Sequence, residues 1–202
     1  MHIERQDLER IIDIAQEAGR LAVSMQRSGL RNITGKSNDI DIVTEADLAG
    51  EELIRSALAV DFPGPGFWGE ESNQIPEEEY FWLVDPIDGT VNYAQGLPHY
   101  SVNIGLNRGD ETLLAVTLAL PQGRVYWALA GEGAYVRTAE GDARLRVNEV
   151  DRLRDAVLST GFPYDRAENP DNNVMEFAYL MPRCRGVRRM GTAAVDLAWV
   201  AE

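Results

Sequence analysis

Two carboxylates stand close together directly after an apolar run in this chain. The segment DPIDGT occupies positions 85–90 and follows YFWLV at 80–84. Pro86 cannot donate a hydrogen bond to a sheet ladder, so we expect the strand to end at Asp85 and both acids to lie on a stiff turn at a sheet edge. Two ionised carboxylates this close repel each other, and a bound cation removes the repulsion.

The residue types in the chain indicate which cation would bind. With two histidines and one cysteine in total, a zinc cluster is excluded, and an all-oxygen shell of the kind preferred by Mg²⁺, Mn²⁺ or Ca²⁺ is favoured. Mg²⁺ takes few protein carboxylates and leaves positions for water and phosphate oxygens. Gly89 permits close backbone approach, and N–H groups of the segment that begins at Thr90 could face an anion. The pattern therefore predicts a metal site for phosphate chemistry.

Closely spaced aspartates also occur in three other kinds of structure. A turn whose aspartates accept hydrogen bonds from backbone amides is the alternative without a metal. An EF-hand is excluded, because its ligands stand at alternate positions before a glycine. A phosphatase of the haloacid dehalogenase type needs two aspartates that are two apart near the end of the first strand, whereas these are three apart and about eighty residues into the chain.

The elements that must position the motif are of mixed α and β type. Helical spacing of apolar residues predicts an amphipathic helix from 6 to about 27, with Gly29 as its stop. Ile40 and Ile42 alternate as in a short strand, and a second helix is expected from Thr44 to about 59. A brief strand through 67–68 is expected before the motif.

After the motif the pattern changes to alternating apolar residues. Four segments predict the strands of an antiparallel meander: 100–106, 112–120, 124–130 and 133–136. Four later segments predict a buried strand, a helix, a strand and a helix in turn: 156–162, 173–181, 186–190 and 191–202. We expect an α+β fold in layers, with one domain over 1–150 and the start of a second over 151–202.

Composition excludes some classes of partner. The 202 residues include 33 Asp and Glu against 19 Lys and Arg, and the formal net charge of −14 repels nucleic acid and anionic lipid. The basic segment RCRGVRR at 183–189 is short and is interpreted as a solvated strand flank. The sequence has no signal-type segment and no membrane-length apolar run, and Cys184 is its single cysteine. We expect a soluble cytoplasmic protein that binds neither nucleic acid nor membranes.

Four linked motifs resemble the inositol monophosphatase family. In the family's order they are DIVTEAD from 41, GEES from 69, WLVDPIDGTVNYAQGLPHYSVNIGL from 82 and RRMGTAAVDLAWVA from 188. The resemblance spans nearly the whole chain. It implies a layered αβαβα sandwich of the inositol monophosphatase and sugar phosphatase type. It also implies Mg²⁺-dependent, lithium-sensitive hydrolysis of a phosphomonoester, with inositol monophosphate favoured as the substrate.

The resemblance implies a ligand set for the metals. Glu70, Asp85 and the carbonyl of Ile87 would bind a first metal, and Asp85 would bridge to a second metal held by Asp88. Two or three Mg²⁺ ions are implied, with Mn²⁺ as an alternative. The first metal would lower the pKa of a bound water, and the second would stabilise the leaving alkoxide.

The resemblance also implies catalytic and substrate-binding residues. Thr90, with Asp47 behind it, would orient or deprotonate the water, and Glu70 belongs with them among the catalytic residues. Thr44 and Asp47 fit a helix capping box as well, and both roles can coexist. Lys36 is either a cation on the phosphate side or a plain exposed lysine. The residues implied for substrate binding are Asp88, Gly89, Thr90, Gly191, Thr192 and Ala193.

Several polar and small residues have structural interpretations. His99 is expected to be a hydrogen-bonded residue rather than a catalyst. Glu77–Glu79 are expected at the surface, and a solvated turn is the alternative for Glu70 and Glu71. Packing alone could account for the alanines that follow Thr192.

The chain departs from the family pattern after its last motif. That pattern continues for several tens of residues, with a W-D-x-A-A-G-like segment whose aspartate completes the second metal site. The absence of a glycine cap or a basic last turn near Glu202 favours the interpretation of a fragment, with apolar surface of the second domain left exposed.

Two alternative functions follow from this departure. One is a non-catalytic phosphatase-like scaffold that holds a partner, or one metal, without turnover. The other is a related phosphatase that acts on fructose bisphosphate, histidinol phosphate or 3′-phosphoadenosine compounds. The resemblance implies a homodimer in each case.

Overall fold

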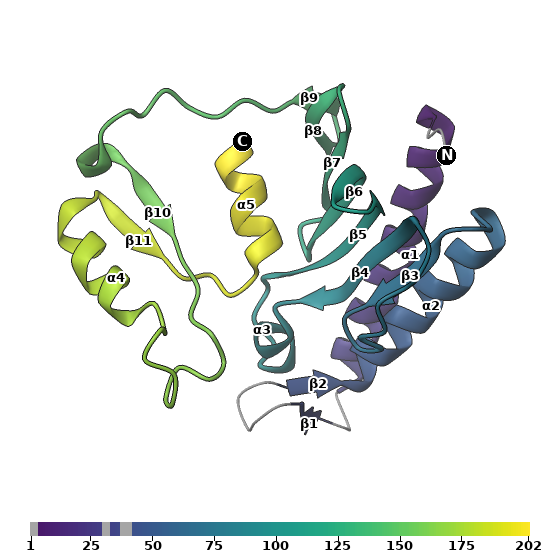
Figure 1. Ribbon diagram of the computed structural model, residues 1–202, viewed down its shortest axis with the longest axis horizontal. Helices are drawn as coiled ribbons and strands as arrows, with labels where there is room; N and C mark the ends of the chain where they lie inside the picture. Colours follow the sequence, from purple (N-terminus) through teal and green to yellow (C-terminus); the bar gives the residue numbers. More distant parts are fainter. Residues whose placement is uncertain (1–3, 30–32, 37–41) are drawn as a thin grey trace.

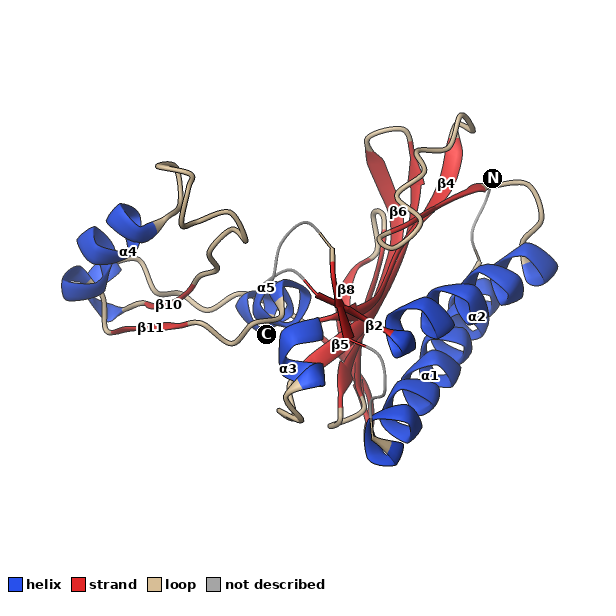
Figure 2. Cartoon of the chain, turned by 90° about the horizontal axis from the view of Figure 1, so that it is seen from below, coloured by secondary structure: helices blue, strands red, loops and turns tan. Residues whose placement is uncertain are grey.

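A seven-stranded sheet organises the chain in the computed structural model, which describes residues 4–29, 33–36 and 42–202. Two long helices cover one face of the sheet and a shorter helix lies on the other (Figure 1, Figure 2). The strands follow the order β3-β4-β5-β6-β7-β8-β9, and β3 and β4 are the parallel pair. Their bounds are β3 Gly66–Gly69, β4 Tyr80–Asp88, β5 Tyr100–Arg108, β6 Glu111–Leu120, β7 Arg124–Leu129, β8 Gly133–Thr138 and β9 Gly141–Arg144.

The predicted helices before the motif are confirmed. The first, α1, spans Arg5–Ser28 and ends at Gly29, whose φ of 84° suits glycine. The second, α2, spans Glu45–Asp61 with Thr44 as its N-cap, two residues longer than expected. The short hairpin before it consists of β1 Ile33–Gly35 and β2 Ile42–Thr44, while Ile40 lies outside the described residues.

The main core lies between the two long helices and the sheet. Side chains alternate along a strand, so every second residue of β4, β5 and β6 faces α1 and α2. The largest fully buried side chains of this core include Trp82, Tyr93, Tyr100, Ile104 and Leu106. The predicted meander is confirmed over β5 to β8, and β9 is an additional strand. The four residues of β9 are all exposed and carry no apolar alternation, so periodicity could not predict this strand.

The predicted end of the strand at Asp85 is wrong. Strand β4 continues to Asp88, because Asp85 pairs with Asn103 and Asp88 pairs with Ser101. Between these two pairs, Pro86 and Ile87 of β4 oppose the single residue Val102 of β5, which makes a β-bulge. Pro86 lies within this bulge, where the ladder of hydrogen bonds is interrupted. The missing N–H of proline therefore costs no ladder hydrogen bond there.

The last part of the chain contains the predicted element types. A parallel pair, β10 Val157–Ser159 and β11 Gly186–Arg188, is accompanied by α4 Val174–Leu180, and the 3₁₀ turns are Leu153–Asp155 and Met181–Arg183. The helix α5, Ala193–Ala201, packs on β5 and β6 of the large sheet through buried Val195. We propose that the chain divides near residue 151, where an extended segment leads from β9 toward β10 (Figure 1).

The expectation that 156–162 forms a buried strand is wrong. The strand β10 covers only Val157–Ser159, two of its three residues are exposed, and Val157 is 54% exposed. Apolar residues are also exposed on α4 and α5, among them Met175, Tyr179 and Leu197. This part of the chain therefore presents apolar surface, as expected. Among the described residues, no helix combines the length and apolar character that a membrane crossing needs.

Candidate metal and phosphate site

The bulge in β4 places both acids of the motif on one face of the sheet. In a regular strand, residues three apart point to opposite faces. Val84 and Ile87 are three residues apart but are both buried in the core below α1 and α2, because the bulge adds one residue between them. Asp85 and Asp88 consequently both point to the opposite face, into a cleft, and the next helix, α3 Thr90–Ala94, begins two residues after Asp88.

These two carboxylates open into a cleft of about 700 Å³ on that face. Glu70 lies at its rim, just after β3, and α5 forms part of its wall. Small and polar residues of the neighbouring strands line its floor, including Asn103, Gly105 and Thr117. The cleft is therefore wide enough for a small ligand and carries three acids.

Asp85 is the most strongly perturbed acid of the cleft. Burial raises the pKa of its carboxyl well above the ordinary value, and repulsion from Glu70 and Asp88 adds to the rise in pKa. The backbone N–H of Ile87 donates to Asp85 Oδ1 at 3.1 Å, and this hydrogen bond opposes the rise in pKa weakly. A divalent cation would relieve this repulsion, and the all-oxygen donors suit Mg²⁺ or Mn²⁺.

The predicted ligand set is only partly assembled. Within the part of the chain that the structure describes, no group of three or more His, Cys, Asp or Glu side chains is arranged to hold a metal ion. Glu70 and Asp85 contact each other. The carboxylate of Asp88, however, accepts a hydrogen bond from Thr192, and the carboxylate of Glu70 forms an ion pair with a lysine. Because Mg²⁺ commonly uses one or two protein carboxylates, Glu70 and Asp85 still fit such an ion.

Lys36 is the cation beside Glu70. Its ammonium group lies 2.8 Å from Glu70 Oε1 and 2.7 Å from Glu71 Oε1, and its side chain is 20% exposed. The interpretation as a plain exposed lysine is therefore wrong. Burial favours a lower pKa of Lys36, but the hydrogen bonds to Glu70 and Glu71 outweigh it and the pKa is raised. Glu71 is buried in this contact, so a solvated turn does not describe it.

Thr90 and Asp47 meet as expected. Thr90 Oγ1 lies 3.1 Å from Asp47 Oδ1 and 3.0 Å from the carbonyl oxygen of Ile87, and both side chains are buried. Asp47 Oδ2 accepts from the N–H of Thr44 at 2.8 Å and from its hydroxyl at 2.5 Å. The capping role and the contact with Thr90 thus coexist on the two oxygens of one carboxylate. Burial raises the pKa of Asp47, although these hydrogen bonds oppose the rise.

Asp88 joins the motif to α5, more than a hundred residues later. Thr192 Oγ1 donates to Asp88 Oδ2 at 2.6 Å, the N–H of Ala194 donates to the same oxygen at 2.8 Å, and the N–H of Ala193 donates to Oδ1 at 3.2 Å. Asp88 therefore caps α5 from a distant segment. The amides expected to face a phosphate are occupied by this carboxylate. Ala193 is exposed, so packing does not account for it.

Two glycines allow the motif and the turn before α5 to touch. Gly89 has φ of 93°, and a Cβ there would lie 3.1 Å from the carbonyl oxygen of Gly191. Gly191 has φ of 90°, and a Cβ there would lie 2.9 Å from the side-chain nitrogen Nδ2 of Asn92. Both positions thus need glycine for its conformation and for its lack of a side chain.

Sequence reasoning missed three residues that hold the site. Asn92 Nδ2 donates to the carbonyl oxygens of His99 at 2.8 Å and Met190 at 2.7 Å, which fixes the turn before α5. Ser101 Oγ, fully buried, lies 3.2 Å from Thr192 Oγ1. Glu51 Oε2 accepts from the N–H of Glu71 at 2.8 Å and so holds the loop that carries Glu70. Of these three residues, only Glu51 had a signal in the sequence, because it is an acid on the apolar face of a predicted helix.

His99 does not fit its prediction. In the described structure, its Nε2 is buried and has no hydrogen-bond partner, so the prediction of a hydrogen-bonded side chain is not met at this nitrogen. The ring packs against Trp199 of α5 with centroids 5.1 Å apart. Burial lowers the pKa of His99, and the charges of Asp196 and Asp88 oppose this effect. Its role in the described structure is packing.

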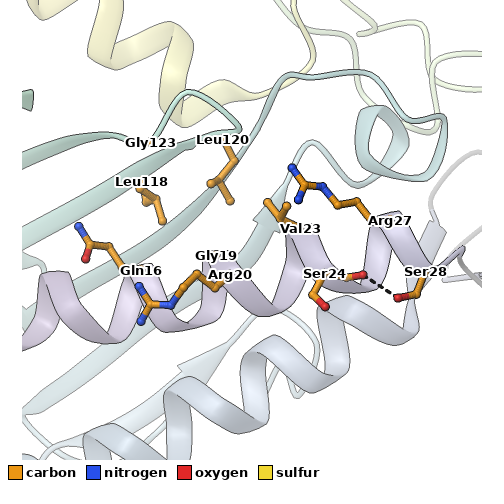
Figure 3. A pocket seen from close by; sticks show the side chains of 10 residues that line it. All are labelled: Gln16, Gly19, Arg20, Val23, Ser24, Arg27, Ser28, Leu118, Leu120 and Gly123. Carbon is orange, nitrogen blue, oxygen red and sulfur yellow. Dashed lines mark hydrogen bonds between the residues drawn. The ribbon is translucent and has the colours of Figure 1, made fainter. Parts of the chain in front are cut away.

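A separate hollow lies on the helix-covered face of the sheet (Figure 3). It has a volume of about 550 Å³ and lies between α1 and the end of β6. Leu118 and Leu120 line it, together with residues of α1 such as Arg20 and Arg27. The described residues that line it include no carboxylate, so this hollow lacks the ligands that the cleft offers to a metal.

Comparison with known proteins supports one family. A family model described as the inositol monophosphatase family matches residues 6–202. The inositol-1-monophosphatase of Rhizobium meliloti is 38% identical over 80% of this chain and 60% of its own length. That of Caulobacter vibrioides is 36% identical over 82% of this chain and 65% of its own length. The Nus factor SuhB of Pseudomonas aeruginosa is 36% identical over 93% of this chain and 70% of its own length.

Solved structures agree with this similarity. The extragenic suppressor protein SuhB of Bartonella henselae has a TM-score of 0.84 at 32% identity, covering 96% of this chain and 73% of its own. Inositol monophosphatase from Anabaena has a TM-score of 0.81 at 32% identity, covering 97% of this chain and 70% of its own. These likenesses confirm the predicted fold class. The chain spans less than two thirds of the length of the first two curated relatives.

Proposed function

Because this chain belongs to the inositol monophosphatase family, we propose that it carries the site of a divalent-metal-dependent phosphomonoesterase, with inositol monophosphate as the substrate. The observation that supports this most strongly is the buried pair of Thr90 and Asp47, 3.1 Å apart, next to the acidic cleft. The hydrogen bond between Thr44 and one carboxylate oxygen of Asp47 is sufficient to cap α2. The other oxygen of Asp47 binds the hydroxyl of Thr90, and a hydroxyl held by a carboxylate is suited to activate a water molecule.

The metal ligands are proposed from the cleft. Glu70, Asp85 and the carbonyl oxygen of Ile87 would hold the first ion, and Asp88 would contribute to a second. When bound, such ions supply an acidified water and neutralise charge on the phosphate. Binding at Glu70 competes with Lys36, which now neutralises that carboxylate.

The chain's own residues would move the proton. Hydrolysis forms a bond from the water oxygen to phosphorus and breaks the bond from phosphorus to the alcohol oxygen. The leaving alkoxide takes a proton from solvent water, so the products are inorganic phosphate and the alcohol. Thr90 would take the proton of the water while it gives its own to Asp47, 3.1 Å away. The raised pKa of Asp47 makes it a better proton acceptor than an ordinary carboxylate.

We further propose two or three Mg²⁺ ions, with Mn²⁺ as an alternative, a homodimer and a cytoplasmic location. The free thiol of Cys184 agrees with a reducing compartment. The formal net charge of −14 argues against nucleic acid and anionic membranes as partners.

Phosphate release tests the proposal. The substrates are inositol 1-phosphate and a small panel of phosphomonoesters, with Mg²⁺ or with EDTA, and the variants are Asp85→Asn and a matched surface control, Glu79→Gln. We expect release that needs Mg²⁺, that Asp85→Asn abolishes and that Glu79→Gln leaves unchanged. Equal release by Asp85→Asn, with folding checked by circular dichroism, would refute the metal site.

A second candidate function is a non-catalytic scaffold that binds a partner protein. It is favoured by the similarity to a protein named Nus factor SuhB and by the exposed apolar residues of α4 and α5. Calorimetric titration with Mg²⁺ separates the two functions. Binding that Asp85→Asn removes supports the enzyme, and a folded chain that binds no Mg²⁺ supports the scaffold.

A further inference from the structure

A buried acid on α2 holds the loop that carries Glu70. The Oε2 atom of Glu51 accepts hydrogen bonds from the backbone N–H of Glu71 at 2.8 Å and from that of Ser72 at 3.4 Å. The backbone N–H groups of residues 70 and 73 donate to carbonyl oxygens instead, each at 2.9 Å. Glu51 therefore supplies the acceptor for two of the four amides in this loop.

Both carboxylate oxygens of Glu51 are fixed. Its Oε1 lies 2.8 Å from Nη2 of Arg55, one helical turn later. The guanidinium of Arg55 in turn lies 4.0 Å from the centroid of the Phe67 ring in β3. A buried carboxylate is stable only when hydrogen bonds and opposite charge replace its lost hydration. The loop amides are part of that replacement, so the loop cannot move away without leaving charge of Glu51 unpaired.

The glycine before the loop leaves room for this carboxylate. A Cβ at Gly69 would lie 2.2 Å from Oε2 of Glu51, which is too close for any pair of non-bonded atoms. Gly69 does not have a positive φ, so the contact requires its lack of a side chain and not an unusual backbone conformation. An alanine at this position would therefore displace the carboxylate from the loop amides without straining the backbone.

The same helix holds the proposed water-activating pair. Asp47 lies one helical turn before Glu51, about 6 Å away along the axis of α2, and both are buried. Asp47 accepts a hydrogen bond from Thr90, as Glu51 does from the loop of Glu70. The helix thus connects the two sides of the cleft. Glu70 needs this support because its side chain is 43% exposed, and ordering a free side chain on binding costs free energy.

We propose that Glu51 is a positioning residue for the metal site, and that it holds Glu70 beside Asp85 in the absence of the ion. The inference rests on the proposed function, because it takes Glu70 and Asp85 as ligands of the first metal. Residues that orient metal ligands typically contribute about 10- to 100-fold to metal affinity. Glu51 acts through the backbone next to the ligand and not on the ligand's own carboxylate, so we expect an effect at the lower end of that range.

Titration with Mg²⁺ in a calorimeter tests the inference. Glu51→Ala removes both acceptor oxygens, and Gly69→Ala displaces the carboxylate. The matched control is Glu52→Ala, because the carboxylate of Glu52 accepts from Ser56 on the exposed face of α2. We expect the first two variants to weaken Mg²⁺ binding about tenfold. The control should stay within about twofold of the wild type.

Two further measurements separate positioning from a general loss of structure. Glu51→Gln keeps one acceptor for the loop and should restore most of the affinity, and turnover of Glu51→Ala should return to the wild-type value when Mg²⁺ is saturating. Hydrogen exchange in EDTA should be faster at the amide of Glu71 in Glu51→Ala and Gly69→Ala. Exchange at Ala46, at the start of the same helix, should be unchanged.

Three results would overturn the role of Glu51. They are unchanged Mg²⁺ affinity in Glu51→Ala, an equal loss in Glu52→Ala, and a second full loss when Gly69→Ala is added to Glu51→Ala. Gly69→Ala keeps the charge of Glu51 and carries the test if Glu51→Ala does not fold. A wild type that binds no Mg²⁺ would refute the proposed metal site itself, whereas equal binding by the wild type and Glu51→Ala would refute Glu51 alone.

Discussion

Replacement of Asp88 tests whether this acid holds the fold together as well as facing the cleft. Its carboxylate accepts hydrogen bonds from Thr192, Ala193 and Ala194 and caps α5. Loss of an N-cap costs about 0.5–2 kcal/mol, and a hydrogen bond to a charged group contributes about 1.5–3 kcal/mol. We therefore expect Asp88→Ala to lower the free energy of unfolding by about 2 kcal/mol, and Asp88→Asn by about half as much, since asparagine keeps one acceptor.

The sign of this effect separates two roles of Asp88. If it served only as a metal ligand, its removal from the metal-free protein would relieve repulsion with Asp85 and raise stability. Asp85→Asn supplies that comparison. The pKa of Asp85 is raised by folding, so its ionised form opposes the folded state at neutral pH. We expect Asp85→Asn to be as stable as the wild type in EDTA, or more so.

Urea unfolding in EDTA, followed by the fluorescence of the four tryptophans, measures both variants. Hydrogen exchange at the amides of Ala193 and Ala194 shows whether any loss begins at α5. An Asp88→Ala variant at least as stable as the wild type, with unchanged exchange at these amides, would refute the cap.

Three further predictions concern other parts of the molecule. Thr90→Val should reduce the turnover number by about 10²- to 10⁴-fold, with Mg²⁺ affinity from calorimetry unchanged, because it removes the hydroxyl beside the water. The pKa values of Glu9 and Asp142 are lowered, first of all by hydrogen bonds to Arg137. This network therefore stabilises the protein fully above the ordinary carboxyl pKa of about 4, and the stabilisation is lost as pH falls below that value through the lowered pKa values. Arg137→Gln should therefore lower Tm at pH 7 and flatten its decline in acid. Gly89→Ala should cost about 1–2 kcal/mol in urea unfolding, because φ of 93° disfavours a side chain.

Matched variants control these three experiments. Thr90→Ser keeps the hydroxyl and should restore most of the turnover, and equal losses in Ser and Val would contradict the proton relay. Arg20→Gln changes an exposed arginine and should leave the pH profile of Tm unchanged. Gly96→Ala also has positive φ, 71°, but meets no atom within 4 Å, so it should cost stability without lowering turnover. Equal turnover losses at both glycines would contradict the close contact at Gly89.

Local features of the sequence determined most of the elements. The apolar spacing of α1, the capping residues Thr44 and Asp47 and the alternating strands β5 to β8 depend on neighbours a few residues away, so they could be predicted. The linked motifs identified the family and placed Thr90 beside Asp47. Burial of β10 was predicted wrongly, because local apolarity does not say what covers a strand.

The tertiary structure alone decided how the site residues meet. A bulge opposite β5 turned Asp85 and Asp88 to one face, and spacing within the motif could not show it. The contact of Asp88 with the start of α5 joins segments more than a hundred residues apart. Lys36 similarly reaches Glu70 from a separate hairpin. Such contacts depend on the packing of whole layers, whereas periodicity and caps are set by the nearest residues along the chain.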